Sequence, residues 1–270
     1  MRTRKTTWIL LAVVVILAVV TLVRTTMRQE EGEVLVLCGG SMRAVLEEII
    51  DRYKQVSQDT VLATYGGSGE LTAQLTQTEK GDIFVCHDPF MPWAAERGRV
   101  QTWATVGYLD PVIVVPKGNP KGITGLEDLA QPGLRLGIGD QVHSSSGVVV
   151  KHLLEKLDYA DAIRQNVRLE TKGHQQRCTD VDLGSLDAAI VWNAVAHLFR
   201  EKLEVIPIPK ENIDAITTAT YGPSDLKNIK VTIGVTRYAE GNEAASRFYN
   251  FATAECRDLF KEYGFRPVEE

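Results

Sequence analysis

Short runs of β-prone apolar residues recur along the chain, and amphipathic stretches separate several of them. The runs lie at residues 34–37, 61–63, 83–85, 112–115, 134–138 and 188–191. Strands that alternate with helices are typical of α/β folds, in which helices cover a sheet of parallel strands. We therefore predict an α/β fold.

The amphipathic stretches predict three helices, each after a strand and a short polar loop. The first has its apolar positions on one face at 3.6-residue spacing: Met42, Val45, Leu46, Ile49, Ile50 and Tyr53. Ser41 directly precedes it and is a typical N-cap residue. The second and third helices are predicted to begin after Ser68 and after Ser146. A serine therefore stands at the start of each predicted helix.

Two extended runs are suitably placed to connect two halves of the molecule. Residues 110–117 form the first run and residues 231–235 form the second. A chain that crosses twice builds two lobes, one of them discontinuous in sequence. We predict a first lobe of residues 30–110 and 231–270, and a second lobe of residues 111–230.

The composition is that of an ordinary globular protein. The 270 residues are 44% hydrophobic and 24% charged, with a formal net charge of −5. Acidic and basic residues are interspersed, so the chain has no basic stripe of the kind that neutralises nucleic-acid phosphates. We therefore expect no nucleic-acid partner.

The N-terminus carries a membrane-targeting pattern. Arg2, Arg4 and Lys5 precede an apolar run at 8–20. This run is slightly short for a spanning helix of roughly 20 residues and slightly long for the roughly 7 to 15 apolar residues of a cleaved signal. Because no small-x-small cleavage pattern or lipid-accepting Cys follows closely, we predict that residues 1–29 are an uncleaved anchor and linker, with a cleaved signal as the alternative. The body would then be periplasmic or otherwise extracytoplasmic.

Three polar loops share one design at the start of a predicted helix. They lie at residues 37–41, 65–69 and 143–147 and are rich in Gly and Ser. A helix N-terminus presents unpaired N–H groups and about half a positive charge, so it attracts anions. The hydroxyls of Ser41, Ser68 and Ser146 add donors. Together the loops predict a pocket for a fully ionised oxyanion; the alternative for each loop alone is ordinary helix capping.

The cysteines allow several interpretations. They are Cys38, Cys86, Cys178 and Cys256. In an oxidising compartment they are able to form up to two disulfides, but their wide spacing matches no zinc motif. Cys38 and Cys86 each end a predicted strand and His87 follows the second, so a redox pair or a soft-metal site is one hypothesis. The alternative is that both are small buried residues or form one structural disulfide.

No catalytic constellation is recognisable in the sequence. The five histidines belong to no His-Glu-x-x-His helix, and the chain has no Gly-x-Ser-x-Gly elbow. The loop at 66–69 lacks the Lys of a nucleotide-phosphate loop. We therefore expect a binding protein rather than an enzyme, with no cofactor.

Six short motifs occur in an order that is specific in combination. They are Cys38-Gly39-Gly40-Ser41-Met42, Tyr65-Gly66-Gly67-Ser68-Gly69-Glu70-Leu71, Gly81-Asp82-Ile83-Phe84-Val85, Gly137-Ile138-Gly139-Asp140, Asp187-Ala188-Ala189-Ile190-Val191-Trp192 and Tyr263-Gly264-Phe265-Arg266-Pro267. Together they resemble the molybdate-binding proteins of bacterial ABC importers, from Glu33 to Pro267. The resemblance implies a type II periplasmic-binding-protein fold, in which two lobes, each a mostly parallel sheet flanked by helices, close over an oxyanion.

The resemblance also implies a ligand set. The two serine ligands of the family fall on Ser41 and Ser68, and a backbone donor falls on Ser146, where the family has Ala. A second backbone donor falls near His174, and the tyrosine ligand falls on Trp192. The last two are departures from the family pattern. Tryptophan donates only through its indole N–H, and a protonated His174 would raise anion affinity at lower pH.

The expected function is capture of molybdate or tungstate by a monomeric solute-binding protein that delivers the ion to an ABC-transporter permease. Sulfate and phosphate stay open because the sequence does not give the cavity radius. Phosphate keeps a proton at neutral pH and needs an acceptor, for which Glu70 and Asp140 are the candidates. The alternative function is a membrane-anchored sensor or interaction module that reads an anion or a metal.

Overall fold

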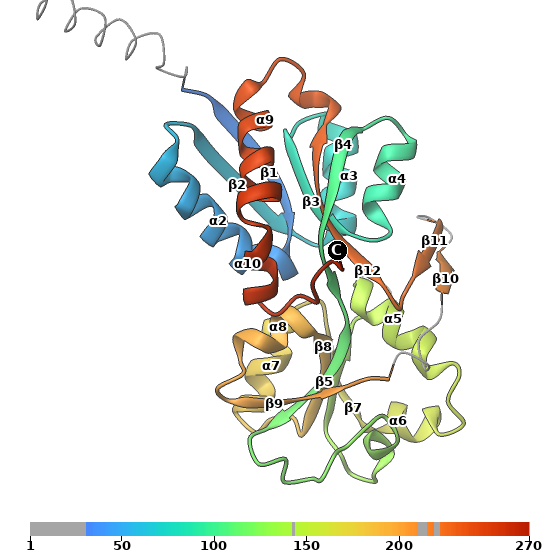
Figure 1. Ribbon diagram of the computed structural model, residues 1–270. Helices are drawn as coiled ribbons and strands as arrows, with labels where there is room; N and C mark the ends of the chain where they lie inside the picture. The colour runs from blue at the N-terminus through green and yellow to red at the C-terminus, as the bar shows by residue number, and fades with distance from the viewer. Residues whose placement is uncertain (1–30, 142–143, 210–214, 219–221, 270) are drawn as a thin grey trace, which may run out of the picture.

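The computed structural model describes residues 31–141, 144–209, 215–218 and 222–269. The predicted anchor at 1–29 lies outside these ranges, as does His143 of the third polar loop. Within them, no helix combines the length and the apolar character needed to cross a membrane. The described residues form two α/β lobes, one above the other in Figure 1.

Five strands form the first sheet, in the order β2-β1-β3-β12-β4 (Figure 1). Their bounds are β1 Glu33–Gly39, β2 Thr60–Gly66, β3 Ile83–His87, β4 Val100–Leu109 and β12 Ile229–Thr236. β1 is parallel to β2 and β3, whereas β12 is antiparallel to β3 and β4. One face carries α2 (Arg43–Val56), α9 (Glu243–Asn250) and α10 (Arg257–Glu262), and the other carries α3 (Ser68–Thr78) and α4 (Phe90–Glu96).

The second sheet repeats this plan, in the order β7-β6-β8-β5-β9. Its strands are β5 Pro111–Pro116, β6 Leu136–Gly139, β7 Val167–Thr171, β8 Ala188–Trp192 and β9 Leu203–Pro207. β6 is parallel to β7 and β8, whereas β5 is antiparallel to β8 and β9. The helices that contact this sheet are α5 (Ser145–Leu154), α7 (His174–Asp182) and α8 (Asn193–Leu198). In each sheet, four strands therefore run in one direction, and one antiparallel strand, β12 or β5, follows a crossing between the lobes.

The remaining elements are short. They are the helices η1 (Gly40–Met42), η2 (Glu127–Ala130), α6 (Ala160–Asn166), η4 (Arg237–Ala239) and η5 (Phe251–Glu255), and the hairpin strands β10 (Ala215–Thr218) and β11 (Gly222–Asp225). η1 runs directly into α2, and α6 packs on η2.

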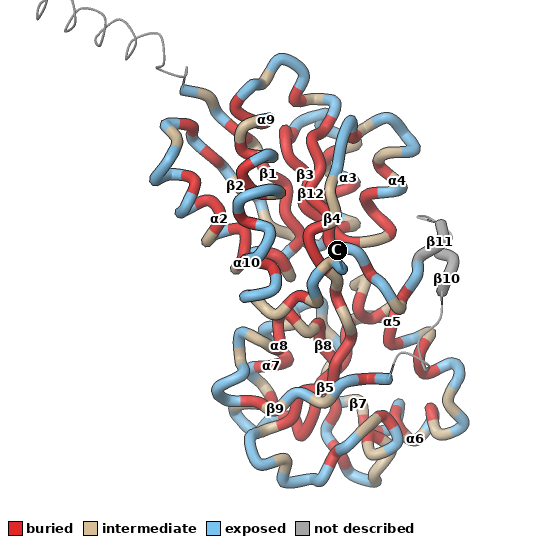
Figure 2. The backbone as a smooth tube through the Cα atoms, in the orientation of Figure 1, coloured by how far each residue is buried: buried red, intermediate tan, exposed pale blue. Residues whose placement is uncertain are grey.

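Buried residues, red in Figure 2, lie along the strands and on the helices that pack against the sheets, and most of them are apolar. The predicted apolar face of α2 is buried: Val45, Leu46, Ile49, Ile50 and Tyr53. Along β1, Val36 faces the core under α2, and Leu37 faces the core under α3 and α4. Each fully buried side chain of this size stabilises the fold by about 1.5–3 kcal/mol. The predicted α/β fold and its six β-prone runs are confirmed.

An aspartate performs the same structural task in each lobe. Asp82 precedes β3, and its Oδ2 accepts the Leu35 N–H at 2.7 Å. Asp187 precedes β8, and its Oδ2 accepts the Arg135 N–H at 2.8 Å. Both carboxylates belong to mostly buried residues and satisfy an N–H next to the point where two parallel strands begin to pair. The aspartates of the two sequence motifs therefore fix strand ends rather than bind ligand.

Asp110 marks the crossing from the first sheet to the second. The Asp110 N–H donates to Asn193 Oδ1 at 3.0 Å, and the Asp110 carbonyl accepts from the Asn193 N–H at 2.9 Å. Its carboxylate pairs with Arg266 at 2.9 Å. Arg266 also donates to the carbonyl of Lys227 at 3.1 Å, just before β12 returns the chain to the first sheet. Arg266 of the C-terminal motif thus holds both crossings together.

The buried acceptor role of Asp82 predicts a specific loss of stability. Asp82→Ala leaves the Leu35 N–H without its acceptor, which should lower the free energy of unfolding by about 1–3 kcal/mol. Asp51→Ala is the matched control, because Asp51 forms an exposed surface pair with Lys54 and should change stability by less than about 1 kcal/mol. Urea unfolding measures both. Equal losses in the two variants would contradict the assigned role.

Candidate functional site

A cavity of about 710 Å³ lies between the lobes, where loops from both sheets meet. From the first lobe it is lined by residues 39–41, 66–70 and 87–90, which follow β1, β2 and β3. From the second it is lined by residues 144–145, 172–175 and 192, which follow or end β6, β7 and β8. The carboxyl ends of parallel strands therefore face each other, the usual position of a ligand site in α/β sheets.

The first-lobe wall is made by two glycine-rich loops that approach each other closely. Gly39 and Gly66 are paired across β1 and β2. A Cβ on Gly39 would lie 2.8 Å from Ser68 Oγ and 2.5 Å from Met42 Cε, so a larger residue there would force both side chains to shift. Ser41 and Ser68 both line the cavity. Neither hydroxyl has a hydrogen-bond partner in the described part of the chain, so both are available to a ligand.

The second-lobe wall begins with the N-terminus of α5. Ser144 is its N-cap, and Ser144 Oγ accepts the Gly147 N–H at 3.0 Å. Ser144 and Ser145 line the cavity, whereas Ser146 is buried behind them. Ser146 Oγ lies 3.2 Å from Ser144 Oγ. The helix starts before Ser146 rather than after it, which brings the two preceding serines to the cavity.

His174 begins α7 and lies on the same wall. Its Nδ1 is 3.0 Å from Arg177 Nη2 and 3.4 Å from the Trp192 backbone N–H, so two donors point at this one nitrogen. Nδ1 must therefore accept, and the ring proton sits on Nε2. Burial, and then the charge of Arg177, hold the pKa of His174 well below its ordinary value. The condition for a rise in anion affinity at lower pH, a protonated His174, is therefore not met in this geometry: the ring is a neutral donor through Nε2–H.

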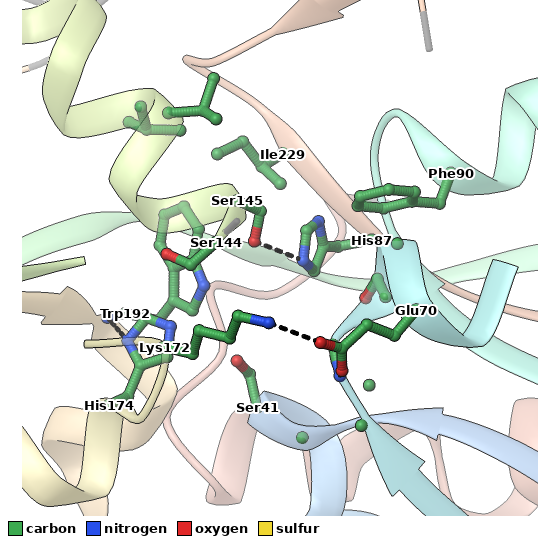
Figure 3. A pocket seen from close by; sticks show the side chains of 18 of the residues that line it. Ser41, Glu70, His87, Phe90, Ser144, Ser145, Lys172, His174, Trp192 and Ile229 are labelled. Atoms are coloured by element: carbon green, nitrogen blue, oxygen red, sulfur yellow. Dashed lines mark hydrogen bonds and ion pairs between the residues drawn. The ribbon is translucent and has the colours of Figure 1, made fainter. Parts of the chain in front are cut away.

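Trp192 ends β8 and closes the cavity beside His174 (Figure 3). The two rings stack with centroids 5.8 Å apart. Trp192 is 1% exposed, and its Nε1 has no hydrogen-bond partner in the described chain. A buried N–H without an acceptor is costly, by about 1–3 kcal/mol. At the edge of a cavity it is a donor in place for a ligand.

Arg177 supplies a buried positive charge that no motif in the sequence marks. It is 0% exposed and donates to the Thr171 carbonyl, to His174 Nδ1 and, at 3.4 Å, to Ser146 Oγ. No carboxylate among the described residues pairs with it. Burial lowers its pKa to about 10, so the guanidinium stays charged at neutral pH. Its only sequence signal is the three-residue spacing from His174, which puts both on one helix face.

Two polar contacts bridge the lobes across the cavity (Figure 3). Lys172 Nζ pairs with Glu70 Oε1 at 2.7 Å, and Ser145 Oγ lies 3.1 Å from His87 Nε2. His87 Nδ1 lies 2.7 Å from the Asp88 carbonyl and must donate to it, so Nε2 accepts from Ser145. These contacts use Glu70, one of the candidate phosphate acceptors. Asp140, the other candidate, does not line the cavity.

The cysteines do not form the reactive pair that the sequence allowed. All four are free and buried. Cys38 lies in the core under α2 and Cys86 in the core under α3 and α4, so the two thiols face opposite sides of the sheet. Burial raises the pKa of both thiols. The described residues contain no metal-binding group of three or more His, Cys, Asp or Glu, so Cys38, Cys86 and His87 do not make a metal site.

Comparisons with known proteins agree with this architecture. A family model described as bacterial extracellular solute-binding protein matches residues 34–266. A Haemophilus influenzae protein named only as a binding protein is 26% identical and covers 94% of this chain and 99% of its own. The molybdate-binding protein ModA of Escherichia coli is 21% identical, over 87% of this chain and 90% of its own. The sulfate-binding protein SubI of Mycobacterium tuberculosis has a similar structure, with a TM-score of 0.69 at 18% identity, covering 88% of each chain.

The neutral state of His174 predicts how stability depends on pH. The unfolded chain binds a proton at His174 near pH 6.5, but the folded chain does not, because the folded pKa is lowered. This contribution is therefore fully present above about pH 6.5 and is lost as the pH falls. His174→Asn keeps an acceptor for Arg177 and does not titrate. The variant should therefore lose less stability than the wild type when the pH falls from 7.5 to 5.0.

Urea midpoints at the two pH values measure this difference. His87, whose pKa burial also lowers, is present in both proteins, so the difference reports His174 alone. Parallel losses in wild type and His174→Asn would show that His174 is protonated equally in the folded and unfolded chains, contrary to the geometry.

Proposed function

Because the chain belongs to the bacterial extracellular solute-binding proteins, we propose that its cleft captures a solute that carries a fully ionised tetrahedral oxyanion group. The solute is then delivered to the permease of an ABC importer. The role is binding without catalysis. The proposed ligand residues are Ser41, Ser68, His174 and Trp192, with Ser144 and Ser145 added and Ser146 supporting from behind.

One observation carries the proposal: the polar end of the cavity offers donors that have no acceptor in the described protein. Two are the hydroxyls of Ser41 and Ser68, and two are the ring N–H groups of His174 and Trp192. A fully ionised oxyanion has only acceptors, so it satisfies every one of them. A cation would find no ligand oxygen among these ring N–H groups.

The electrostatic field at this end also favours an anion. α3, α5 and α7 all begin at the cavity wall, and each contributes about half a positive charge at its N-terminus. The buried Arg177 lies behind His174 and Ser146 with its charge unpaired. The Lys172 charge is already offset by Glu70. The surplus of positive charge suits a dianion.

Among free ions, molybdate and tungstate are the proposed ligands, with sulfate next. All three are fully deprotonated at neutral pH and need no acceptor from the protein. Hydrogen phosphate needs one, and Glu70 is engaged by Lys172 and by the Gly67 N–H. The relatives named as molybdate-binding and sulfate-binding support this order.

The cellular setting is part of the proposal. Residues 1–29 are proposed to anchor the body at the outer side of the membrane, where a monomer meets the permease. Closure would move a lobe of residues 30–110 and 231–270 against a lobe of residues 111–230. The two crossings held by Arg266 are the proposed hinge, because they are the covalent links between the sheets.

Substitution of the free donors tests the proposed function. Ser41→Ala, Ser68→Ala and Trp192→Phe should each weaken molybdate and sulfate binding by about 10- to 100-fold, because a hydrogen bond to a charged group contributes about 1.5–3 kcal/mol. Ser185→Ala, on an exposed loop away from the cavity, should leave affinity unchanged. Titration calorimetry measures all four. Unchanged affinity in the three cavity variants would exclude this site, and no binding of any oxyanion by wild type would exclude the function.

A further inference from the structure

The cavity is much larger than a free tetrahedral oxyanion. Five heavy atoms, each given the roughly 30 Å³ that a water molecule occupies in the liquid, fill about 150 Å³. The cavity has about 710 Å³. The lobes are not simply far apart, because the Lys172–Glu70 pair and the Ser145–His87 hydrogen bond already span the cleft. The additional volume therefore does not come from separation of the lobes.

Apolar side chains make up most of the wall around the additional volume, and the carboxylate of Asp88 also lines the cavity. Phe90 of α4, Val148 and Val149 of α5, and Leu226 and Ile229 before and at the start of β12 all line the cavity. In Figure 3, Phe90 and Ile229 lie on the other side of the Ser145–His87 hydrogen bond from Ser41. The cavity thus has a polar end with donors and an apolar end.

We propose that the solute is an organic phosphate monoester with a short apolar tail. This inference rests on the proposed function, because the phosphoryl group would occupy the same donors as a free oxyanion. A monoester has its second pKa near 6, so at neutral pH its phosphoryl oxygens are acceptors only. Hydrogen phosphate instead keeps a proton. The ester therefore removes the objection that disfavours inorganic phosphate.

The tail gives the apolar end an occupant. A free ion at the donors would leave unfilled the apolar end that Phe90, Val148 and Ile229 line. A tail of several carbon atoms covers these side chains and gains about fourfold in affinity for each buried methylene. A carboxylate head is less suited, because its two oxygens and single charge match fewer of the donors and less of the positive charge around Arg177. The cavity volume is in the range of pockets that hold small organic ligands.

A homologous series of esters on the full chain tests the inference. Methyl, propyl and pentyl phosphate share one head and differ only in the tail. Titration calorimetry at pH 8 should give an affinity that rises by about fourfold per methylene until the apolar end is filled. Pentyl phosphate should then bind more tightly than molybdate or sulfate.

A matched pair of variants locates the tail. Val148→Thr is isosteric and places a hydroxyl on the apolar wall, so it should weaken pentyl phosphate binding by about three- to tenfold and leave methyl phosphate unchanged. Val205→Thr makes the same change on an exposed position of β9 outside the cavity, and should have no effect on either ester.

The outcomes separate this inference from the proposed function. If molybdate, sulfate or methyl phosphate binds and the longer esters bind no more tightly, the tail site is overturned and the oxyanion site stands. The same holds if Val148→Thr and Val205→Thr behave alike towards pentyl phosphate. If none of these anions binds, the proposed function fails as well.

Discussion

The hydrogen bonds of the buried Arg177 guanidinium are the interaction on which the second-lobe half of the site depends. They join the end of β7 at Thr171, the start of α5 at Ser146 and the start of α7 at His174. Burying a charge costs several kcal/mol unless an opposite charge compensates it. No carboxylate in the described chain compensates the charge of Arg177. An anion bound in the cavity beside His174 would compensate it. The buried charge of Arg177 therefore both lowers the stability of the fold and favours the proposed binding of an anion.

The two lobes reach this arrangement by the same route. In each, parallel strands end at the cleft, an aspartate fixes the strand starts at the opposite edge, and helices begin where the strands end. Much of this could be predicted, because buried strands such as β1, β3 and β5 are continuous apolar runs. β4, β7 and β9 could not, because they mix buried and exposed residues and lack such a run. Their position depends on pairing with distant strands.

The residues that line the cavity were predictable where their position follows directly from a loop motif or a strand end. Ser41 and Ser68 line the cavity because glycines bring their loops together, and Trp192 lines it because it ends a buried strand. Ser146 does not, since the helix begins two residues earlier than expected, at Ser145, and successive side chains on a helix point about 100° apart. The charge state of His174 was unpredictable without Arg177, whose partners come from three different elements.

The proposed function requires an oxyanion to bind to the free donors at the polar end of the cleft. Crystals of the protein grown with tungstate, measured at the tungsten absorption edge, test it directly. One anomalous peak is expected within hydrogen-bonding reach of Ser41 Oγ, Ser68 Oγ and Trp192 Nε1. A peak elsewhere, or an empty cleft at saturating tungstate, would contradict it.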